Sequence, residues 1–166
     1  MTENNDLFAG IDLSFTNTGI VIIDTTGKIV EQALISTKHK KDNPHDIEER
    51  IMFINTAVYE FLKKYSETLK FTLIEGLSFG SAGESTFQLA ALNYFIRITL
   101  FQNKILFGSI PPTKLKKFVT GTGQCKKNLI LKEVYKKWGM DFNDDNLCDA
   151  FSLAKMAQFN FLNKSR

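Results

Sequence analysis

Hydrophobic positions along the chain follow two periods, one typical of strands and one typical of helices. Short apolar runs that are rich in β-branched residues and bounded by glycine, proline or polar turns predict strands. Longer segments in which apolar residues recur every three to four positions predict helices. The predicted strands are residues 6–14, 18–24, 28–36, 70–76 and 104–112, and the predicted helices are residues 47–65, 86–102, 126–139 and 146–162.

The first three strands follow one another closely and predict an antiparallel meander. Gly19 and Gly27 mark the expected turns, with β-branched residues between them. The apolar run at residues 70–76 follows a helical crossover, which is typical of a buried parallel strand. These elements predict one α/β domain over residues 1–166, a mixed five-stranded sheet flanked by helices, which is the layout of the ribonuclease-H-like fold.

Two of the predicted helices differ in how their apolar residues are distributed. The helix at residues 47–65 carries one apolar stripe, and Glu48 and Glu49 lie off it, so these acids are expected to face solvent. The helix at residues 86–102, for which Ser85 is the expected N-cap, is apolar nearly all round. Such a helix needs burial on two sides, and we expect its own sheet on one side and a partner subunit on the other.

Composition narrows the class of protein. Hydrophobic residues make up 43% and charged residues 23% of the chain, which is typical of a soluble globular domain. No apolar run approaches the ~20 residues that span a bilayer. The first ten residues lack the basic and apolar regions of a signal peptide, so we expect a cytoplasmic protein without a membrane partner. Cys125 and Cys148 form no CxxC pair, and His39 and His45 lie in a charged loop, so neither a zinc site nor a disulfide framework is expected.

The net charge of +3 is small, but the charges are unevenly distributed. Between Lys114 and Lys137 there are eight lysines and one acid, Glu133. Local basic density of this kind is typical of a surface that binds polyanions. The simpler alternative is a solvated helix face, and the charge pattern by itself favours that alternative.

Acidic residues occur where the predicted elements would bring carboxylates together. Asp12 lies inside an apolar strand and Glu75 ends another. A carboxylate in a buried strand is costly unless it is paired or bound to a metal, and two of them repel each other. In the last helix, Asp145, Asn146 and Asp149 are spaced to share one face. Oxygen ligands without histidine or thiolate suit Mg²⁺ or Mn²⁺, and two such ions about 3.5–4 Å apart would support phosphodiester hydrolysis.

Each of these acids also has a simpler interpretation. Asp144 can cap the last helix, Glu75 can be a strand-end acid that faces solvent, and Asp149 can be a satisfied polar residue on an amphipathic helix. Taken singly, these interpretations are at least as good as a metal site. The coincidence of three acids in this order along the chain favours the metal site.

The opening stretch GIDLSFTNTGIVIID, residues 10–24, fits two chemistries. Actin-like and sugar-kinase ATPases begin with a similar strand and phosphate-binding turn, and so do metal-dependent nucleases. The ATPase interpretation needs a cleft between two such domains and therefore roughly twice this chain length. Ser14 and Phe15 also stand where a phosphate-binding loop favours glycine, so we expect no nucleotide cofactor.

Four segments resemble the RuvC family of Holliday-junction resolvases, in particular its compact phage-type members. The segments are the opening stretch with Asp12, LIEG with Glu75, IPPTKLKKFVTGTGQCKKNLILKEVYKKWG, and DDNLCDAFSLA with Asp149. Carried over by position, these three acids match the family's metal-binding carboxylates. Lys127, which follows Gly121 and Gly123, matches a lysine that contacts the scissile phosphate or stabilises its charge.

The resemblance implies a metal-dependent homodimer that nicks two opposed strands of a four-way DNA junction. The family places a further acid three residues before the last Asp, where this chain has Asn146, so the oxygen comes either from Asp145 or from the Asn146 amide. Phe79 is the candidate for an aromatic residue that probes the junction. The lysines expected along the DNA arms are Lys114, Lys116, Lys117, Lys126 and Lys127.

Two alternatives to a strict junction resolvase stay open at this point. The replacement at Asn146 keeps a non-cleaving, branched-DNA-binding module of the same fold possible. A broader endonuclease for flaps and other branched DNA would share the mechanism and differ only in its substrate range.

Overall fold

The computed structural model describes residues 5–77 and 83–164. A five-stranded sheet lies at its centre, with strand order β3-β2-β1-β4-β5. The strands are β1 (Leu7–Asp12), β2 (Asn17–Ile23), β3 (Ile29–Ser36), β4 (Leu69–Glu75) and β5 (Phe107–Ile110). The helices are α1 (Asp46–Lys63), α2 (Glu84–Gln102), α3 (Pro112–Thr120), α4 (Lys127–Trp138) and α5 (Asp145–Lys164).

The sheet is mixed, as the sequence predicts. The first three strands form an antiparallel meander, while β4 pairs in parallel with β1 on one side and with β5 on the other. The helix α1 makes the crossover from β3 to β4, and α2 makes the crossover from β4 to β5. The α/β class and the mixed five-stranded sheet are therefore confirmed.

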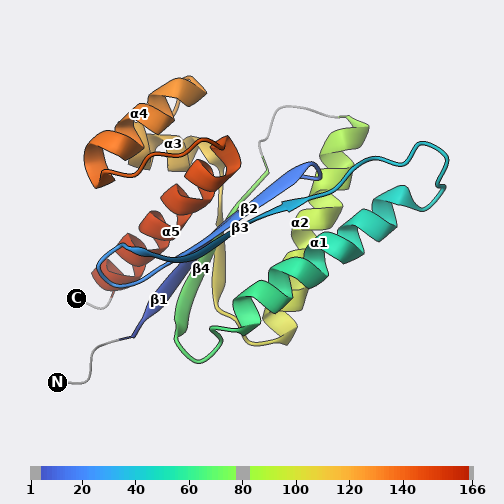
Figure 1. The fold of residues 1–166 in the computed structure, drawn as a ribbon, viewed down its shortest axis with the longest axis horizontal. Coiled ribbons are helices and arrows are strands. Elements are labelled where there is room, and N and C mark those ends of the chain that lie inside the picture. Colours follow the sequence, from blue (N-terminus) through green and yellow to red (C-terminus); the bar gives the residue numbers. More distant parts are fainter. Residues whose placement is uncertain (1–4, 78–82, 165–166) are drawn as a thin grey trace.

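Helices cover both faces of the sheet (Figure 1). One face of the sheet packs against α1 and α2, and the other packs against α5. The helices α3 and α4 pack on the same side as α5, farther from the sheet. Alternate residues of each strand point to opposite faces, so Ile11 and Ile20 join the core under α1 and α2, whereas Phe8 and Val21 join the core under α5. Among the described residues, no helix is long and apolar enough to cross a membrane.

The structure corrects the sequence prediction by one helix. Pro112 does not end a strand but opens α3, because proline fits the first position of a helix, where its missing N–H costs nothing. Leu115 and Val119, four residues apart, bury the inner face of α3, and Gly121 ends the helix in the left-handed conformation with φ 83°.

Two predictions about local structure were wrong. Ser85 does not cap α2: the helix begins at Glu84 after Gly83, whose carbonyl accepts the first amide hydrogen bonds, and the acid at the first position interacts favourably with the helix dipole. Gly19 does not lie in a turn but inside β2, in register with Asp12. The predictions for Gly27, in the β2–β3 turn at φ 86°, and for the exposed Glu48 and Glu49 are confirmed.

Candidate active site

Asp12 and Glu75 end two neighbouring parallel strands. Ile11 is in register with Ile74, so the two acids that follow them lie at adjoining strand ends. Alternate side chains of a strand point to the same face of the sheet. Asp12 therefore shares a face with Phe8, four residues earlier, and Glu75 shares a face with Leu73, two residues earlier. Phe8 and Leu73 both belong to the core under α5. The two carboxylates therefore belong to the face of the sheet that α5 covers, and Asp12 is only 7% exposed.

Two glycines let α5 approach this end of the sheet. A Cβ atom built on Gly10 would lie within 3.0 Å of the Ala150 carbonyl oxygen and the Ala154 amide nitrogen. A Cβ atom on Gly19 would lie within 3.0 Å of the Asn146 carbonyl oxygen. Since Gly19 is in register with Asp12, the first turn of α5 lies directly beside the strand end that carries the predicted catalytic acid.

The start of α5 is fixed by Asp144. Its Oδ1 accepts hydrogen bonds from the backbone amides of Asn146, at 2.9 Å, and Leu147, at 3.1 Å. The interpretation of Asp144 as an N-cap is therefore confirmed, and this carboxylate has a structural role.

Asp145 and Asp149 lie on one side of α5. Together with Cys148 they lie against Ile130 and Leu131 of α4. The pKa of the Cys148 thiol is raised to about 12, mainly by burial and further by the negative charges of Asp149 and Asp145, although a hydrogen bond with Ser152 opposes the shift. The first two turns of α5 thus carry a concentration of negative charge beside α4.

We expect Cys148 to resist alkylation in the folded protein at pH 8, because its side chain is 1% exposed and its thiolate is strongly disfavoured. A native thiol titration should therefore detect Cys125 alone, which is partly exposed, and urea should reveal the second thiol. The Cys125→Ser variant is the control, since it should leave no fast-reacting thiol. Rapid native labelling of Cys148 in that variant would contradict the packing of α5 against α4.

The end of β4 is held by contacts that the sequence pattern did not reveal. The buried Asn93 side chain of α2 donates a hydrogen bond of 3.0 Å to the Glu75 carbonyl oxygen. The Gly76 amide donates to the Ile110 carbonyl of β5 at 2.6 Å. The available signal was the position of Asn93 next to Leu92 and three residues before Ile96, both buried, because a buried amide needs a hydrogen-bond partner.

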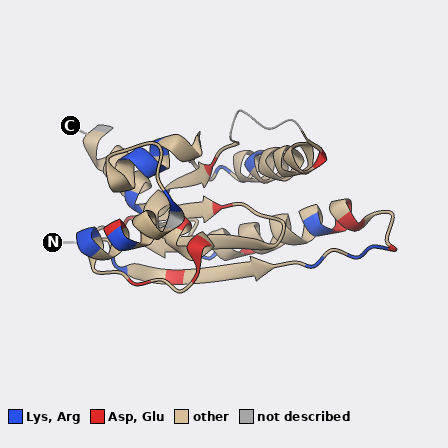
Figure 2. Ribbon diagram, turned by 90° about the horizontal axis from the view of Figure 1, so that it is seen from above, with Lys and Arg blue, Asp and Glu red and all other residues tan. Residues whose placement is uncertain are grey.

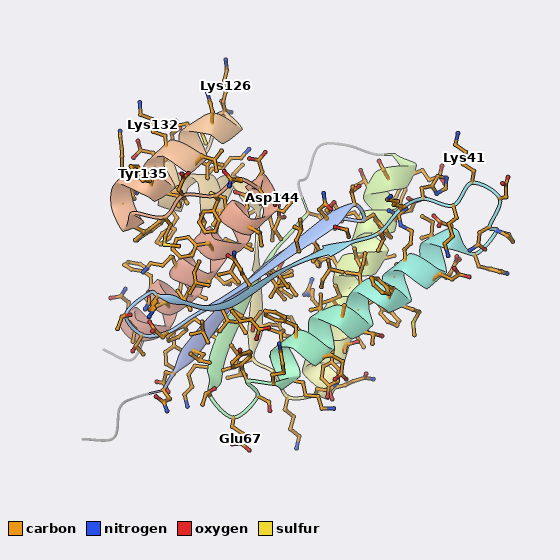
Figure 3. The ribbon with its side chains drawn as sticks, in the orientation of Figure 1. Lys41, Glu67, Lys126, Lys132, Tyr135 and Asp144 are labelled. Carbon is orange, nitrogen blue, oxygen red and sulfur yellow. The ribbon has the colours of Figure 1, made fainter. Side chains whose placement is uncertain are left out.

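The predicted DNA-binding lysines lie on α3 and just before α4. Lys114, Lys117 and Lys126 are exposed, and Lys116 is partly exposed. Lys127 is the first residue of α4, and its side chain lies outside the described part of the structure, as does Phe79. In Figure 3, Lys126, just before α4, and Asp144, just before α5, lie toward the same edge of the molecule, while Glu67 lies at the opposite edge.

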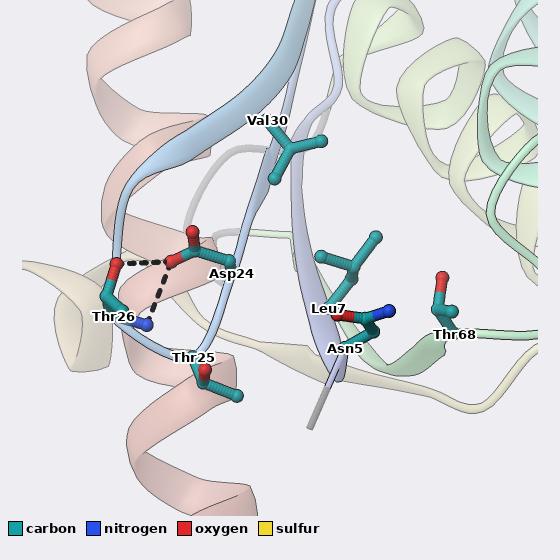
Figure 4. Close-up of a pocket in the computed structure, with 7 residues that line it drawn as sticks. All are labelled: Asn5, Leu7, Asp24, Thr25, Thr26, Val30 and Thr68. Atoms are coloured by element: carbon teal, nitrogen blue, oxygen red, sulfur yellow. Dashed lines mark hydrogen bonds between the residues drawn. The ribbon is translucent and has the colours of Figure 1, made fainter. Parts of the chain in front are cut away.

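A separate hollow of about 600 Å³ lies at the other end of the sheet (Figure 4). It is lined by Leu7, the first residue of β1, and by Asp24 in the turn after β2. The Asp24 carboxylate accepts hydrogen bonds from the Thr26 amide and hydroxyl, at 2.8 and 2.6 Å, so it stabilises a turn. This hollow is therefore distinct from the strand ends that carry Asp12 and Glu75.

The carboxylates fit a hard divalent cation by their chemistry. Asp12, Glu75, Asp145 and Asp149 come from three neighbouring elements and offer only oxygen ligands, which suits Mg²⁺ or Mn²⁺ better than softer ions. Within residues 5–77 and 83–164, no three Asp, Glu, His or Cys side chains are already close enough to hold one ion. An ion bound at this edge would have to draw these carboxylates together.

The mixed five-stranded sheet with helices on both faces defines the class of fold, which is ribonuclease-H-like. The structure of Thermus thermophilus RuvC is similar over 96% of both chains, with a TM-score of 0.74 and 19% sequence identity. A second structure, T. thermophilus RuvC in complex with a Holliday junction substrate, gives a TM-score of 0.75 with the same coverage and identity. A Fowlpox virus resolvase, in a complex with substrate Holliday junction DNA, is similar over 96% of this chain and 98% of the other, with a TM-score of 0.51 and 13% identity. At these identities the likeness establishes the fold.

Sequence comparison establishes the family. The family model described as crossover junction endodeoxyribonuclease RuvC matches residues 8–155, and the chain belongs to this family. A relative named crossover junction endodeoxyribonuclease RuvC, from Brachyspira hyodysenteriae (strain ATCC 49526 / WA1), is 29% identical over 148 residues, which cover 87% of this chain and 89% of the relative. The resemblance to RuvC resolvases is confirmed, and the actin-like ATPase interpretation falls away.

Proposed function

We propose that this protein hydrolyses phosphodiester bonds at four-way DNA junctions with the help of a divalent cation. The observation that carries the proposal is the placement of Asp12, Glu75 and Asp149 on β1, β4 and α5, at one end of the strands and on one face of the sheet, in a chain of the RuvC family. Three carboxylates from separate elements supply the negative charge that Mg²⁺ or Mn²⁺ requires.

In the proposed mechanism, Asp12, Glu75 and Asp149 are the residues that would hold the cations. Two bound cations would supply an activated water and stabilise the leaving oxygen of the phosphodiester. The close approach of α5 at Gly10 and Gly19 fixes Asp149 relative to Asp12, and the Asn93 hydrogen bond fixes the backbone at Glu75. Lys127, at the first position of α4, is the proposed contact to the scissile phosphate.

The helix-side oxygen is proposed to come from Asp145 rather than from Asn146. Asp145 lies on the same side of α5 as Asp149, and the charges of both act on Cys148. We expect Asp145→Asn to weaken Mn²⁺ binding by about tenfold or more, since loss of a ligand or its support costs about 10–100-fold. Asn146→Ala should change the Mn²⁺ Kd by less than about threefold, as measured by calorimetry, and the reverse ranking would assign the ligand to Asn146.

A homodimer is proposed from the outer face of α2. Phe87, Tyr94, Ile98 and Phe101 are exposed, with Phe87 at 71% and Phe101 at 76%, and their spacing places them on one stripe of the helix. A monomer rarely exposes so much contiguous apolar surface. A second copy of the chain would bury this stripe and place two active sites on one junction.

The substitution Ile98→Glu is expected to convert the dimer into a monomer, because it places a charge on this apolar stripe. Light scattering after gel filtration should show the halved mass, and paired nicks should be replaced by slow single nicks. Leu162→Glu is the matched control, since Leu162 is an exposed apolar residue of α5 outside the stripe. An Ile98→Glu protein that stays dimeric would place the subunit interface elsewhere.

The test of the proposed function is cleavage of a synthetic four-way junction in Mg²⁺ or Mn²⁺. We expect symmetric paired nicks in two opposed strands and no cleavage of linear duplex DNA of the same sequence. Flap and three-way substrates in the same assay define the substrate range. Tight junction binding without nicks in either ion would instead favour the non-cleaving module.

A further inference from the structure

A second basic segment lies beside the candidate active site, in the loop between β3 and α1. We call residues 38–41 the basic loop; it consists of Lys38, His39, Lys40 and Lys41, all of them exposed. Lys40 pairs with Glu49 at 3.4 Å, an exposed pair of little energetic weight. Lys38 and Lys41 form no ion pair with any residue that the structure describes, so their charges are available to a ligand.

The residue before this loop is bound to the turn that follows Asp12. The Thr37 amide donates a hydrogen bond of 3.1 Å to the Thr16 carbonyl, and its hydroxyl donates to the Phe15 carbonyl. Arg50 of α1 joins the same contact, because its Nη2 donates to the Phe15 carbonyl at 2.9 Å and its Nε donates to the Thr37 hydroxyl at 2.8 Å. The basic loop therefore starts beside the turn between β1 and β2. That turn follows Asp12 by a few residues along the chain.

Asp46 holds the loop itself. Its carboxylate accepts a hydrogen bond of 3.0 Å from the Lys40 amide, lies 2.7 Å from His39 Nδ1 and lies 3.4 Å from Arg50 Nη1. The hydrogen bond with His39 contributes most to lowering the pKa of Asp46, and burial opposes it, so the carboxylate stays charged. With its side chain 4% exposed, Asp46 links the basic loop to the same Arg50 that braces the turn after Asp12.

The basic loop and the lysines of α3 and α4 lie on opposite sides of the candidate active site. In Figure 3, Lys41 and Lys126 extend toward the same edge of the molecule, with Asp144 at the start of α5 between them. Figure 2, which looks onto that edge, shows blue segments in the α3–α4 region and in the loop before α1, on either side of the sheet. Positive charge on both sides of a cluster of acids suits a polyanion that crosses the cluster.

We propose that the basic loop contacts the phosphate backbone of a DNA arm through Lys38 and Lys41, on the side of the active site away from α3 and α4, and that Asp46 is the positioning residue that holds the loop there. This inference rests on the proposed junction-cleaving function and extends it to a second DNA contact.

The direct test compares two double variants of equal charge. Lys38→Gln/Lys41→Gln is expected to weaken four-way junction binding in EDTA at least about tenfold near 0.1 M salt, and to reduce the slope of log K against log[salt] by about 1.8, from about 0.9 for each lost phosphate contact. The control, Lys63→Gln/Lys104→Gln, removes two exposed lysines at the opposite ends of these helices, since Lys63 is the last residue of α1 and Lys104 follows α2. The salt slope of this control should stay within about 0.3 of the wild type.

The Asp46→Asn variant tests whether Asp46 positions the basic loop, because a positioning role and simple electrostatics predict opposite changes in DNA affinity. Loss of a negative charge should by itself strengthen DNA binding. If Asp46 positions the loop, the variant instead binds the junction about fivefold more weakly, and adding Lys38→Gln/Lys41→Gln to it costs less than about twofold more. Thermal unfolding checks that each variant is folded. If Asp46→Asn does not fold, the comparison of the two double lysine variants tests the DNA contact by itself.

The outcomes separate this inference from the function on which it rests. Wild-type protein that neither binds nor cuts the junction would refute the proposed function. Normal binding and cleavage by the wild type, together with equal salt slopes for the two double variants, would refute the DNA contact of the basic loop alone. Stronger binding by Asp46→Asn would refute its positioning role.

Discussion

Replacing Asp12 with Asn is expected to lower the rate of junction cleavage at least about 1000-fold while the junction Kd changes by less than about threefold. The rate loss corresponds to roughly 4 kcal/mol of transition-state stabilisation, the scale of electrostatic help that a bound metal provides. Asp12 is nearly buried at the end of β1 and so is expected to contribute little to the DNA-binding surface itself. The measurement is single-turnover cleavage in Mg²⁺, with affinity determined separately in EDTA.

Glu75→Gln should behave in the same way, since Glu75 ends the neighbouring strand on the same face. Glu48→Gln is the matched control: it removes one carboxylate from the exposed side of α1 and should leave the cleavage rate within about twofold of the wild type. Calorimetry of Mn²⁺ binding to the same proteins gives a second readout. Asp12→Asn should weaken the affinity for Mn²⁺ at least about tenfold. Full cleavage by Asp12→Asn would show that the metal-binding assignment is wrong.

The sequence predicted the sheet and its acids because those features have strong local signals. An acid such as Asp12 inside an apolar strand conflicts with burial, and the conflict itself points to a function. Glu75 gave a weaker signal. Its place next to Asp12 follows only from the register of β4 with β1, and its place on the same face follows from the alternation of side chains along β4. The pattern also predicted that α2 is apolar nearly all round, and some of its large apolar residues stay exposed in the single chain.

Other features depend on tertiary contacts that no local pattern encodes. Asp46 looked like one more charge in a polar loop, yet it is buried and bonded to residues on both sides of it. The helix α3 was missed because its nine residues are too few for a clear period and its first proline resembled a strand end. Gly10 gave no signal at all, because its importance comes from a helix more than one hundred residues later in the chain.

Gly10→Ala is expected to destabilise the protein by about 3 kcal/mol and to lower cleavage by the surviving folded protein more than about tenfold. The new methyl group would lie within 3.0 Å of the Ala150 carbonyl oxygen, the Ala154 amide nitrogen and the Leu153 Cβ atom. Two of these are backbone atoms of α5, which cannot rotate away, so the helix itself must move. Because Asp149 precedes Ala150, that movement displaces a proposed metal ligand from Asp12, and a displacement of about 1 Å can cost about 100-fold in rate.

Urea unfolding measures the first effect, and cleavage under conditions where the variant is folded measures the second. Gly83→Ala is the control: a Cβ atom there would meet no described atom within 4 Å and the backbone is extended, so its stability should change by less than about 1 kcal/mol. Gly19→Ala should resemble Gly10→Ala, because its Cβ atom would meet the Asn146 carbonyl at the other end of the same contact. A Gly10→Ala protein as stable as Gly83→Ala would contradict the close packing of α5 on β1. A destabilised variant that still cleaves at the wild-type rate would show that Asp149 does not need this helix position for catalysis.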